Sequence, residues 1–216
     1  MTDLTTLAGR PGSRVGVFGG TFDPIHLGHL IVADEACSAL GLQRLLFVPA
    51  RVSPLKTIGG TLFSTDERLE MVRLAVAEDP RFEVSCIDAQ RDGPSFTYQT
   101  LHLLRQHLGP DALLYFIMGM DSLEHFYQWR RPQDILRLAR LAVISRPGAA
   151  PDWSRLEVQV PGLRKATDVI ETLQIGISST EIRRRLQNGE PYRYQLPAAV
   201  YAYLQAHPRP ARLARG

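Results

Sequence analysis

Apolar and polar positions follow two different periods along this chain, and the two periods alternate. Short, almost wholly apolar runs predict buried strands at residues 14–18, 44–49, 82–87, 113–118, 141–145 and 169–175, with a further strand expected at 156–160. Helical spacing of apolar residues, with capping and glycine signals, predicts helices at 28–40, 64–78, 97–108, 179–187 and 197–206, and one that includes 135–139. The chain therefore alternates strand and helix.

This alternation indicates an α/β fold. Strands that are apolar on both faces are typical of a parallel sheet covered on both sides, so we expect a Rossmann-like, doubly wound parallel sheet with helices on both faces. The length suits a single domain over residues 1–216, with an ordered core of about 14–206 and frayed termini.

Four segments of unusual composition follow predicted strands. They are residues 19–29, 48–56, 119–121 and 145–148. In a doubly wound sheet, ligands bind beyond the carboxyl ends of the strands. Four such segments meeting at one edge of the sheet predict a binding site at that edge.

Composition narrows the class of protein. A formal net charge of +3 is too small to favour a protein that coats nucleic acid. No apolar run reaches the roughly 18–20 residues that cross a membrane, and the N-terminus lacks the features of a signal peptide. The two cysteines, Cys37 and Cys86, favour a reduced, cytoplasmic setting. We predict small-molecule partners, no nucleic acid and no membrane; monomer and homo-oligomer both stay open.

The first segment with chemical character is a glycine-rich turn at 19–21 followed by two histidines. The turn matches neither the dinucleotide-binding fingerprint nor a P-loop. His26 and His29 flank Gly28 at a predicted helix start, where backbone N–H groups and the helix dipole favour an anion. A metal pair is the alternative, but it lacks the further ligands that zinc requires. We therefore predict phosphate contact and no metal site.

The second segment is a hydroxyl-rich helix start near residue 178. Ser178 and Glu181 have the spacing of a capping box, and Ile177 with Ile182 that of a hydrophobic staple. This structural explanation is complete without a ligand. Three more groups at the same helix start favour bound phosphate. They are Ser179, Thr180 and Arg183.

Together these segments resemble a known enzyme superfamily. GGTFDPIHLGH at 19–29 and ISSTEIR at 177–183 are similar to the two signatures of the HxGH adenylyltransferases. Further stretches resemble the bacterial nicotinate-nucleotide adenylyltransferases, at 17–30, 47–56, 91–100, 115–129, 143–148 and 177–204. The resemblance implies a single nucleotidyltransferase domain that transfers AMP from ATP to nicotinate mononucleotide. The products are deamido-NAD and pyrophosphate, in NAD biosynthesis, with Mg²⁺ delivered by ATP.

The same resemblance assigns roles to residues. His26 and His29 would be the catalytic contacts to ATP phosphates. ATP binding would involve Gly19, Gly20, Thr21, Phe22, Lys56, Gly119, Asp121, Ser178, Ser179, Thr180 and Arg183. The acceptor would be bound by Thr97, Trp129 and Arg146.

Two positions depart from the family pattern. Leu55 stands where a histidine is usual in the stretch Ser53-Pro54-Leu55-Lys56, and Gln99 stands where aspartate is common. Several assigned residues also have plain structural explanations. Trp129 could cover the core edge, Asp121 and Thr97 could cap helices, and Lys56 could be a solvated loop charge.

Other functions fit the same signatures. A nicotinamide-mononucleotide adenylyltransferase is the nearest alternative, followed by enzymes that use phosphopantetheine or cytidylyl donors. The stretches at 91–100 and 115–129 count against the last two. A non-catalytic nucleotide sensor is the alternative from another class, and intact His26, His29 and Arg183 count against it.

Overall fold

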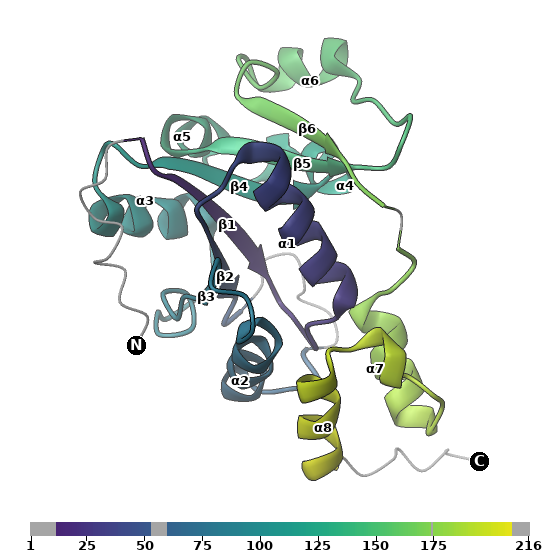
Figure 1. The fold of residues 1–216 in the computed structure, drawn as a ribbon. Helices are drawn as coiled ribbons and strands as arrows, with labels where there is room; N and C mark the ends of the chain where they lie inside the picture. Colours follow the sequence, from purple (N-terminus) through teal and green to yellow (C-terminus); the bar gives the residue numbers. More distant parts are fainter. Residues whose placement is uncertain (1–11, 53–59, 174, 209–216) are drawn as a thin grey trace.

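A computed structural model describes residues 12–52, 60–173 and 175–208 of the chain. The termini expected to fray and the loop that carries Leu55 and Lys56 lie outside these ranges. The described strands form one sheet, drawn in Figure 1. They are β1 (Arg14–Gly20), β2 (Arg44–Pro49), β3 (Phe82–Val84), β4 (Leu113–Gly119), β5 (Arg140–Ser145) and β6 (Thr167–Glu171).

All neighbouring strands are parallel, in the order β3-β2-β1-β4-β5-β6. The helices between and after them are α1 (Leu27–Leu40), α2 (Thr65–Val76), α3 (Thr97–Leu108), α4 (Met120–Glu124), α5 (Pro132–Leu138), α6 (Trp153–Gln159), α7 (Ser179–Asn188) and α8 (Ala198–Ala206). This is the Rossmann-like arrangement that the alternation predicted.

Two hydrophobic clusters lie on opposite faces of the sheet. One packs the apolar side chains of α1, α2, α7 and α8 against the sheet. The other packs α3, α4, α5 and α6 against it. Along β1, for example, Val15 and Val17 belong to the second cluster and Phe18 to the first, since side chains of a strand point to both faces. The sheet is therefore covered on both sides, as expected for its apolar strands.

The register aligns the carboxyl ends of the strands at one edge. Gly20 pairs with Pro49, Gly119 with Ile144 and Ser145 with Glu171. The chain reverses its winding direction between β1 and β4, which is where a doubly wound sheet opens a crevice for ligands. The loops that follow β1 and β4 flank this point.

Some predicted elements were wrong or displaced. Residues 156–160 belong mainly to α6 instead of a strand. Asp152 caps this helix by accepting a hydrogen bond from the backbone N–H of Arg155, and the buried pair Leu156 and Val160 is spaced as on one helix face. The last strand is β6 at Thr167–Glu171 and not 169–175, and β3 ends at Val84.

Helix ends also test the capping predictions. Ser64 and Glu67 form a complete capping box at α2, since each side chain bonds the other's backbone N–H. At α7, Ser178 accepts from the backbone N–H of Glu181, but the Glu181 carboxylate binds arginines instead of returning the bond. Thr97 is the first residue of α3 and not its cap, which is Phe96. None of the described helices is long and apolar enough to cross a membrane.

Candidate active site

The loop from β1 to α1 is shaped by packing against aromatic rings. Phe22 is buried and adopts a left-handed backbone conformation with φ of 48°, which is uncommon for a non-glycine residue. A Cβ on Gly20 would lie 2.8 Å from the Phe22 ring, so only glycine fits there. The ring of Phe22 meets that of His29 edge-on, with 5.0 Å between centroids. Glycine at position 20 thus allows Phe22 to support His29.

His26 and His29 lie side by side at the start of α1. His26 is the N-cap residue, and the two imidazole rings stack with centroids 3.7 Å apart. A Cβ on Gly28 would lie 3.1 Å from two atoms of the His26 ring and 3.7 Å from the carbonyl oxygen of Ile177. The missing side chain of Gly28 therefore leaves room both for His26 and for the segment that leads into α7.

The surroundings determine the charge of His26 and the tautomer of neutral His29. His26 is 6% exposed, and burial lowers its pKa to about 4, so the ring is neutral at pH 7. Its Nδ1 is buried and has no hydrogen-bond partner among the described residues. The Nδ1 of His29 accepts a hydrogen bond from the backbone N–H of His26 at 3.2 Å. In neutral His29 the ring proton is consequently on Nε2.

Helix α7 is attached directly to this loop. Ser179 Oγ donates to the carbonyl oxygen of Pro24 at 2.9 Å, across 155 positions of the sequence. Arg183 Nη1 donates to the carbonyl oxygen of Asp23 at 2.7 Å and lies 3.5 Å from the Asp23 carboxylate. In Figure 1, α7 lies beside the end of α1 that follows β1. The structure thus brings together the two segments that the sequence singled out.

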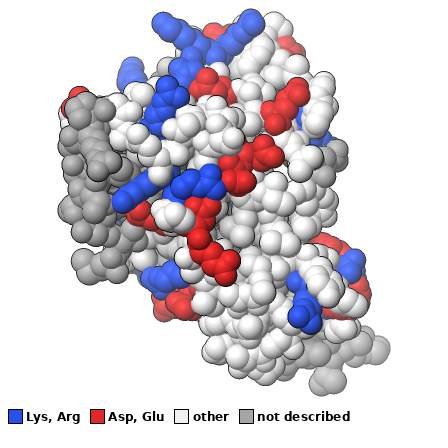
Figure 2. Space-filling model, viewed as in Figure 1, with Lys and Arg blue, Asp and Glu red and all other residues white. Residues whose placement is uncertain are grey.

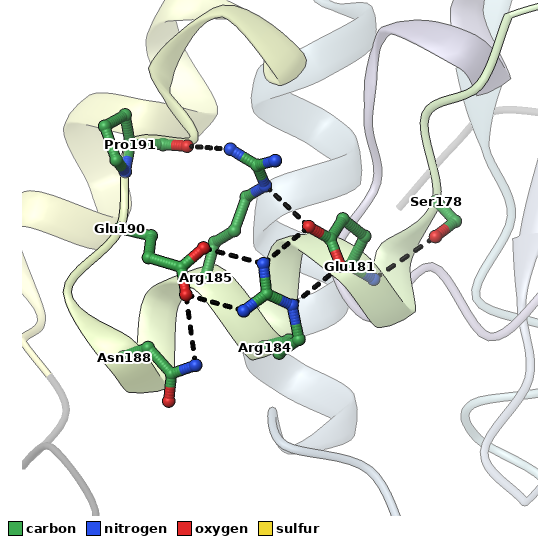
Figure 3. Close-up of polar contacts among 7 residues, drawn as sticks. All are labelled: Ser178, Glu181, Arg184, Arg185, Asn188, Glu190 and Pro191. Carbon is green, nitrogen blue, oxygen red and sulfur yellow. Dashed lines mark hydrogen bonds and ion pairs between the residues drawn. The ribbon is translucent and has the colours of Figure 1, made fainter.

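Only one of three successive arginines in α7 faces the loop. Figure 3 shows the other two, Arg184 and Arg185, turned toward Glu181, Glu190 and Pro191. Both arginines donate to the Glu181 carboxylate, and these hydrogen bonds lower the pKa of that carboxyl to about 2. Arg184 also donates to Glu190 and Arg185 to the Pro191 carbonyl. This leaves Arg183 as the α7 arginine that contacts the β1–α1 loop.

Two buried charged residues at the loop were missed by the sequence analysis. The Asp23 carboxylate is 2% exposed and accepts from the backbone N–H groups of Leu62 and Phe63. Arg68, in the first turn of α2, is 1% exposed and donates to the carbonyl oxygen of Thr21 at 2.6 Å. A sequence signal existed for Arg68, because it lies four residues before a core valine and thus on the buried face of α2.

The predicted acceptor side lies around the start of α3. Trp129 is half-buried and packs against Phe116 and Phe126, with ring centroids 5.8 and 5.5 Å apart. Arg130 lies over the ring of Phe96 and Arg131 over that of Tyr98, 4.8 and 5.0 Å from the centroids. Both arginines are therefore directed toward the first residues of α3, next to Thr97.

A buried polar cluster supports this segment from behind. The Thr100 hydroxyl donates its proton to the Asp88 carboxylate, with both carboxylate oxygens within 2.9 Å, and Arg91 donates to the same group, while burial raises the pKa of the Asp88 carboxyl. Gln99 accepts from the same Arg91 at 2.5 Å. The unusual glutamine thus joins the cluster as a neutral acceptor, and Asp88 supplies the carboxylate for Arg91.

The remaining predicted residues lie at neighbouring strand ends. Gly119 is the N-cap of α4, with open space around the position of a Cβ, and Asp121 is exposed in the first turn of that helix. Arg146 is exposed after β5, and Lys56 lies outside the described residues. One hollow of about 510 Å³ lies between α3 and α5; Tyr98, Gln99 and Arg131 are among the residues that line it, and neither His26 nor His29 is.

The donors around the histidines suit phosphate oxygens better than a metal ion. Imidazole, hydroxyl, guanidinium and backbone N–H groups predominate, and the buried carboxylate of Asp23 already binds two amides and Arg183. Within the described ranges, no group of three or more His, Cys, Asp or Glu side chains is arranged to hold a metal ion. Figure 2 shows basic and acidic side chains interspersed on the face viewed, without a continuous basic stripe.

Comparisons with known proteins agree with this geometry. A family model described as cytidylyltransferase-like matches residues 17–185. A probable nicotinate-nucleotide adenylyltransferase of Roseiflexus sp. (strain RS-1) is 48% identical, over 89% of this chain and 96% of the relative. A protein of the same name from Herpetosiphon aurantiacus is 42% identical, over 88% and 95%.

Solved structures show the same fold. The Plasmodium falciparum nicotinic acid mononucleotide adenylyltransferase complexed with NaAD superposes with a TM-score of 0.71, covering 90% of this chain and 96% of that one. Sequence identity is 18%, so this likeness concerns the fold alone.

Proposed function

Because this chain belongs to the cytidylyltransferase-like family and, within it, to the nicotinate-nucleotide adenylyltransferases, we propose that it transfers the adenylyl group of ATP to nicotinate mononucleotide. The products are deamido-NAD and pyrophosphate. The single observation that carries the proposal is the junction of His26, His29 and α7 at one helix N-terminus. The names of the curated relatives support the choice of acceptor.

The reaction is an in-line displacement at phosphorus. An oxygen of the acceptor's 5′-phosphate forms a bond to the α-phosphorus of ATP, and the bond from that phosphorus to the bridging oxygen of pyrophosphate breaks. The attacking phosphate is already ionised near pH 7 and needs no base. Such a reaction asks the protein for positioning and for stabilisation of charge on the phosphoryl oxygens.

The two histidines would supply ring N–H donors. Nε2–H of His29 would donate to a phosphate oxygen, because its Nδ1 accepts from the backbone of His26. His26, kept neutral by burial, would donate through one N–H in the same region. The N-terminus of α1 adds backbone N–H groups and its dipole. No residue has to act as a nucleophile.

Helix α7 would complete the phosphate site. Ser178, Ser179 and Thr180 lie at its start, and Arg183 is the cation directed to the loop. On the opposite side of the switch point, Gly119 and Asp121 would meet the nucleotide riboses, and Trp129 with Thr97 would frame the pyridine ring. Arg146 and Lys56 remain further expected contacts, to acceptor and to phosphate respectively.

Mg²⁺ is part of the proposal as a companion of ATP. The protein groups at the site suit phosphate, so the ion would be held chiefly by the triphosphate and water. Its chemistry there is to neutralise phosphate charge. We also place the enzyme in the cytoplasm, with ATP and nicotinate mononucleotide as partners, no nucleic acid and no membrane. The free thiols of Cys37 and Cys86 support a reducing compartment.

The test is pyrophosphate release with ATP, Mg²⁺ and each acceptor in parallel: nicotinate mononucleotide, nicotinamide mononucleotide and phosphopantetheine. We expect kcat/KM to favour the acid over the amide by about 30- to 1000-fold, or roughly 2–4 kcal/mol, because a site of donors leaves the amide NH₂ facing another donor. Equal values or a preference for the amide would overturn the nicotinate assignment. ATP binding without turnover of any acceptor would indicate a nucleotide sensor instead.

A further inference from the structure

Arg68 of α2 is buried in an unusual way for an arginine. Its guanidinium donates to Thr21 O at 2.6 Å, to Thr65 Oγ1 at 3.1 Å and to Arg51 O at 3.4 Å. Its Nε has no partner among the described residues, and burial lowers the pKa of the side chain. The nearby Asp23 carboxylate offsets part of this burial without a hydrogen bond to the guanidinium among the described contacts. A buried cation whose hydrogen bonds go mainly to carbonyl oxygens is still costly, because those dipoles replace only part of its hydration. Such a cost suggests a role other than stability.

The Thr21 carbonyl, to which Arg68 donates, lies in the strained turn before the two histidines. Thr21 directly precedes Phe22, whose left-handed backbone persists only if its surroundings hold it. Arg68 fixes the residue before Phe22 through the Thr21 carbonyl. The residue after Phe22 is Asp23, and its carboxylate is held by the backbone N–H groups of Leu62 and Phe63. Both anchors come from α2 or the segment leading into it, so α2 sets the position of the ring that supports His29.

The hydrogen bond to the Arg51 carbonyl links Arg68 to the side of the site that would bind nicotinate mononucleotide. The backbone N–H of Arg51 donates to Ser95 Oγ at 3.2 Å, and the Arg51 guanidinium pairs with Asp92 at 2.5 Å. The backbone N–H of Ser95 in turn donates to the Val52 carbonyl at 2.9 Å. Residues 51–52 are therefore bound to the loop that precedes α3. Arg68 lies between the phosphate-side turn and the acceptor-side loop, and contacts both directly or through one residue.

We propose that Arg68 is a positioning residue for adenylyl transfer, which holds the turn at Thr21 and the segment at Arg51 in a single arrangement so that phosphate donors and acceptor site keep a fixed relation. It also places a positive charge behind the turn. This inference rests on the proposed function. It predicts that loss of Arg68 impairs turnover beyond any loss of stability.

Arg105 offers a matched control at the other edge of the sheet. It is also partly buried, burial also lowers its pKa, and it donates to the carbonyl oxygens of Pro110, Ala112 and Leu138. These carbonyls precede β4 and β5, at the amino ends of the strands. Replacing either arginine by methionine removes similar hydrogen bonds to backbone, but only one replacement touches the site.

The experiment measures melting temperature, kcat and KM for ATP in Arg68→Met, Arg68→Lys and Arg105→Met. We expect both methionine variants to melt lower than the parent. Arg68→Met should lose about 10- to 100-fold in kcat, since small displacements of reacting groups cost on this scale, whereas Arg105→Met stays within about twofold. Arg68→Lys should keep KM for ATP close to the parent value while kcat stays low, because an ammonium retains the charge but cannot reproduce the fork.

Each outcome decides the proposal. Equal kinetics per folded molecule in Arg68→Met and Arg105→Met would show that Arg68 only stabilises the fold. Full recovery of kcat in Arg68→Lys would show that only the positive charge of Arg68 matters, and would overturn its positioning role. If Arg68→Met fails to fold, the kinetic split in Arg68→Lys carries the test. If the parent protein turns over no acceptor, the proposed function has failed. The ATP-induced rise in melting temperature then decides, and Arg68 keeps its role only if Arg68→Met loses more of this rise than Arg68→Lys and Arg105→Met do.

Discussion

The amino and carboxyl edges of the sheet differ in how their buried charged and aromatic groups are held, although Ser13 Oγ at the amino edge also lacks a partner among the described residues. At the amino edge, Arg140 pairs with both carboxylate oxygens of Asp168, and Arg105 donates to carbonyls that precede β4 and β5. At the carboxyl edge, His26 keeps a buried nitrogen without a partner among the described residues, and Phe22 keeps a strained backbone. Polar groups that are satisfied by their neighbours stabilise the fold, while backbone strain and unpartnered buried polar atoms are typical of places where a ligand completes the site.

The largest effect expected from this contrast is at His29. His29→Ala should lower kcat by roughly 10²–10³, the scale for one lost donor to a developing oxyanion. The acceptor's affinity should change much less. His107→Ala is the control, since His107 is exposed near the amino edge and its ring contacts only the Leu103 carbonyl in the described structure. A near-normal kcat in His29→Ala would contradict the role of His29, and with it of the carboxyl edge, in stabilising the transferred phosphoryl group.

The next largest effect concerns the pH dependence of stability, to which the buried His26 at the carboxyl edge should contribute. The pKa of His26 is about 4 in the folded protein and near 6.5 when unfolded, so between these values the unfolded chain binds the extra proton. The free energy of unfolding should therefore fall as pH drops from 6.5 to 4, by on the order of 3 kcal/mol from this residue. His26→Asn should lose that part of the pH dependence, measured by denaturant unfolding at pH 7 and 4.5. Parallel pH profiles for parent and variant would contradict the burial argument.

A smaller effect should distinguish two adjacent arginines of α7, Arg183 and Arg184. Arg183→Ala should raise KM for ATP or lower kcat by roughly tenfold, the scale of one charge-assisted contact. It should also lower the melting temperature by a few degrees, because Asp23 loses its cation. Arg184→Ala should change activity hardly at all and stability little, because its ion pairs are on the surface. If the two variants behave alike, the orientation of Arg183 is irrelevant.

Much of this architecture could be predicted from the order of residues. Local periodicity placed β2 and α3 at their observed bounds, and apolar strands indicated a parallel sheet with two covered faces. The meeting of strand ends at one edge placed the histidine pair in a site, and the resemblance to the adenylyltransferases joined the segment at 177–183 to it. The error at 156–160 arose where a short apolar run fits both periods, and the capping Asp152 decided for a helix.

The sequence by itself therefore determined the elements, the doubly wound class and the family, since all three depend on local spacing and on short motifs. Tertiary structure alone decided which arginine of α7 faces Asp23, that Arg68 donates to the Thr21 carbonyl, and which nitrogen of neutral His29 holds the proton. Each of these depends on contacts between segments far apart in the chain. A residue's type shows what it can donate or accept, but only the folded chain shows which partner it meets and how much water remains around it.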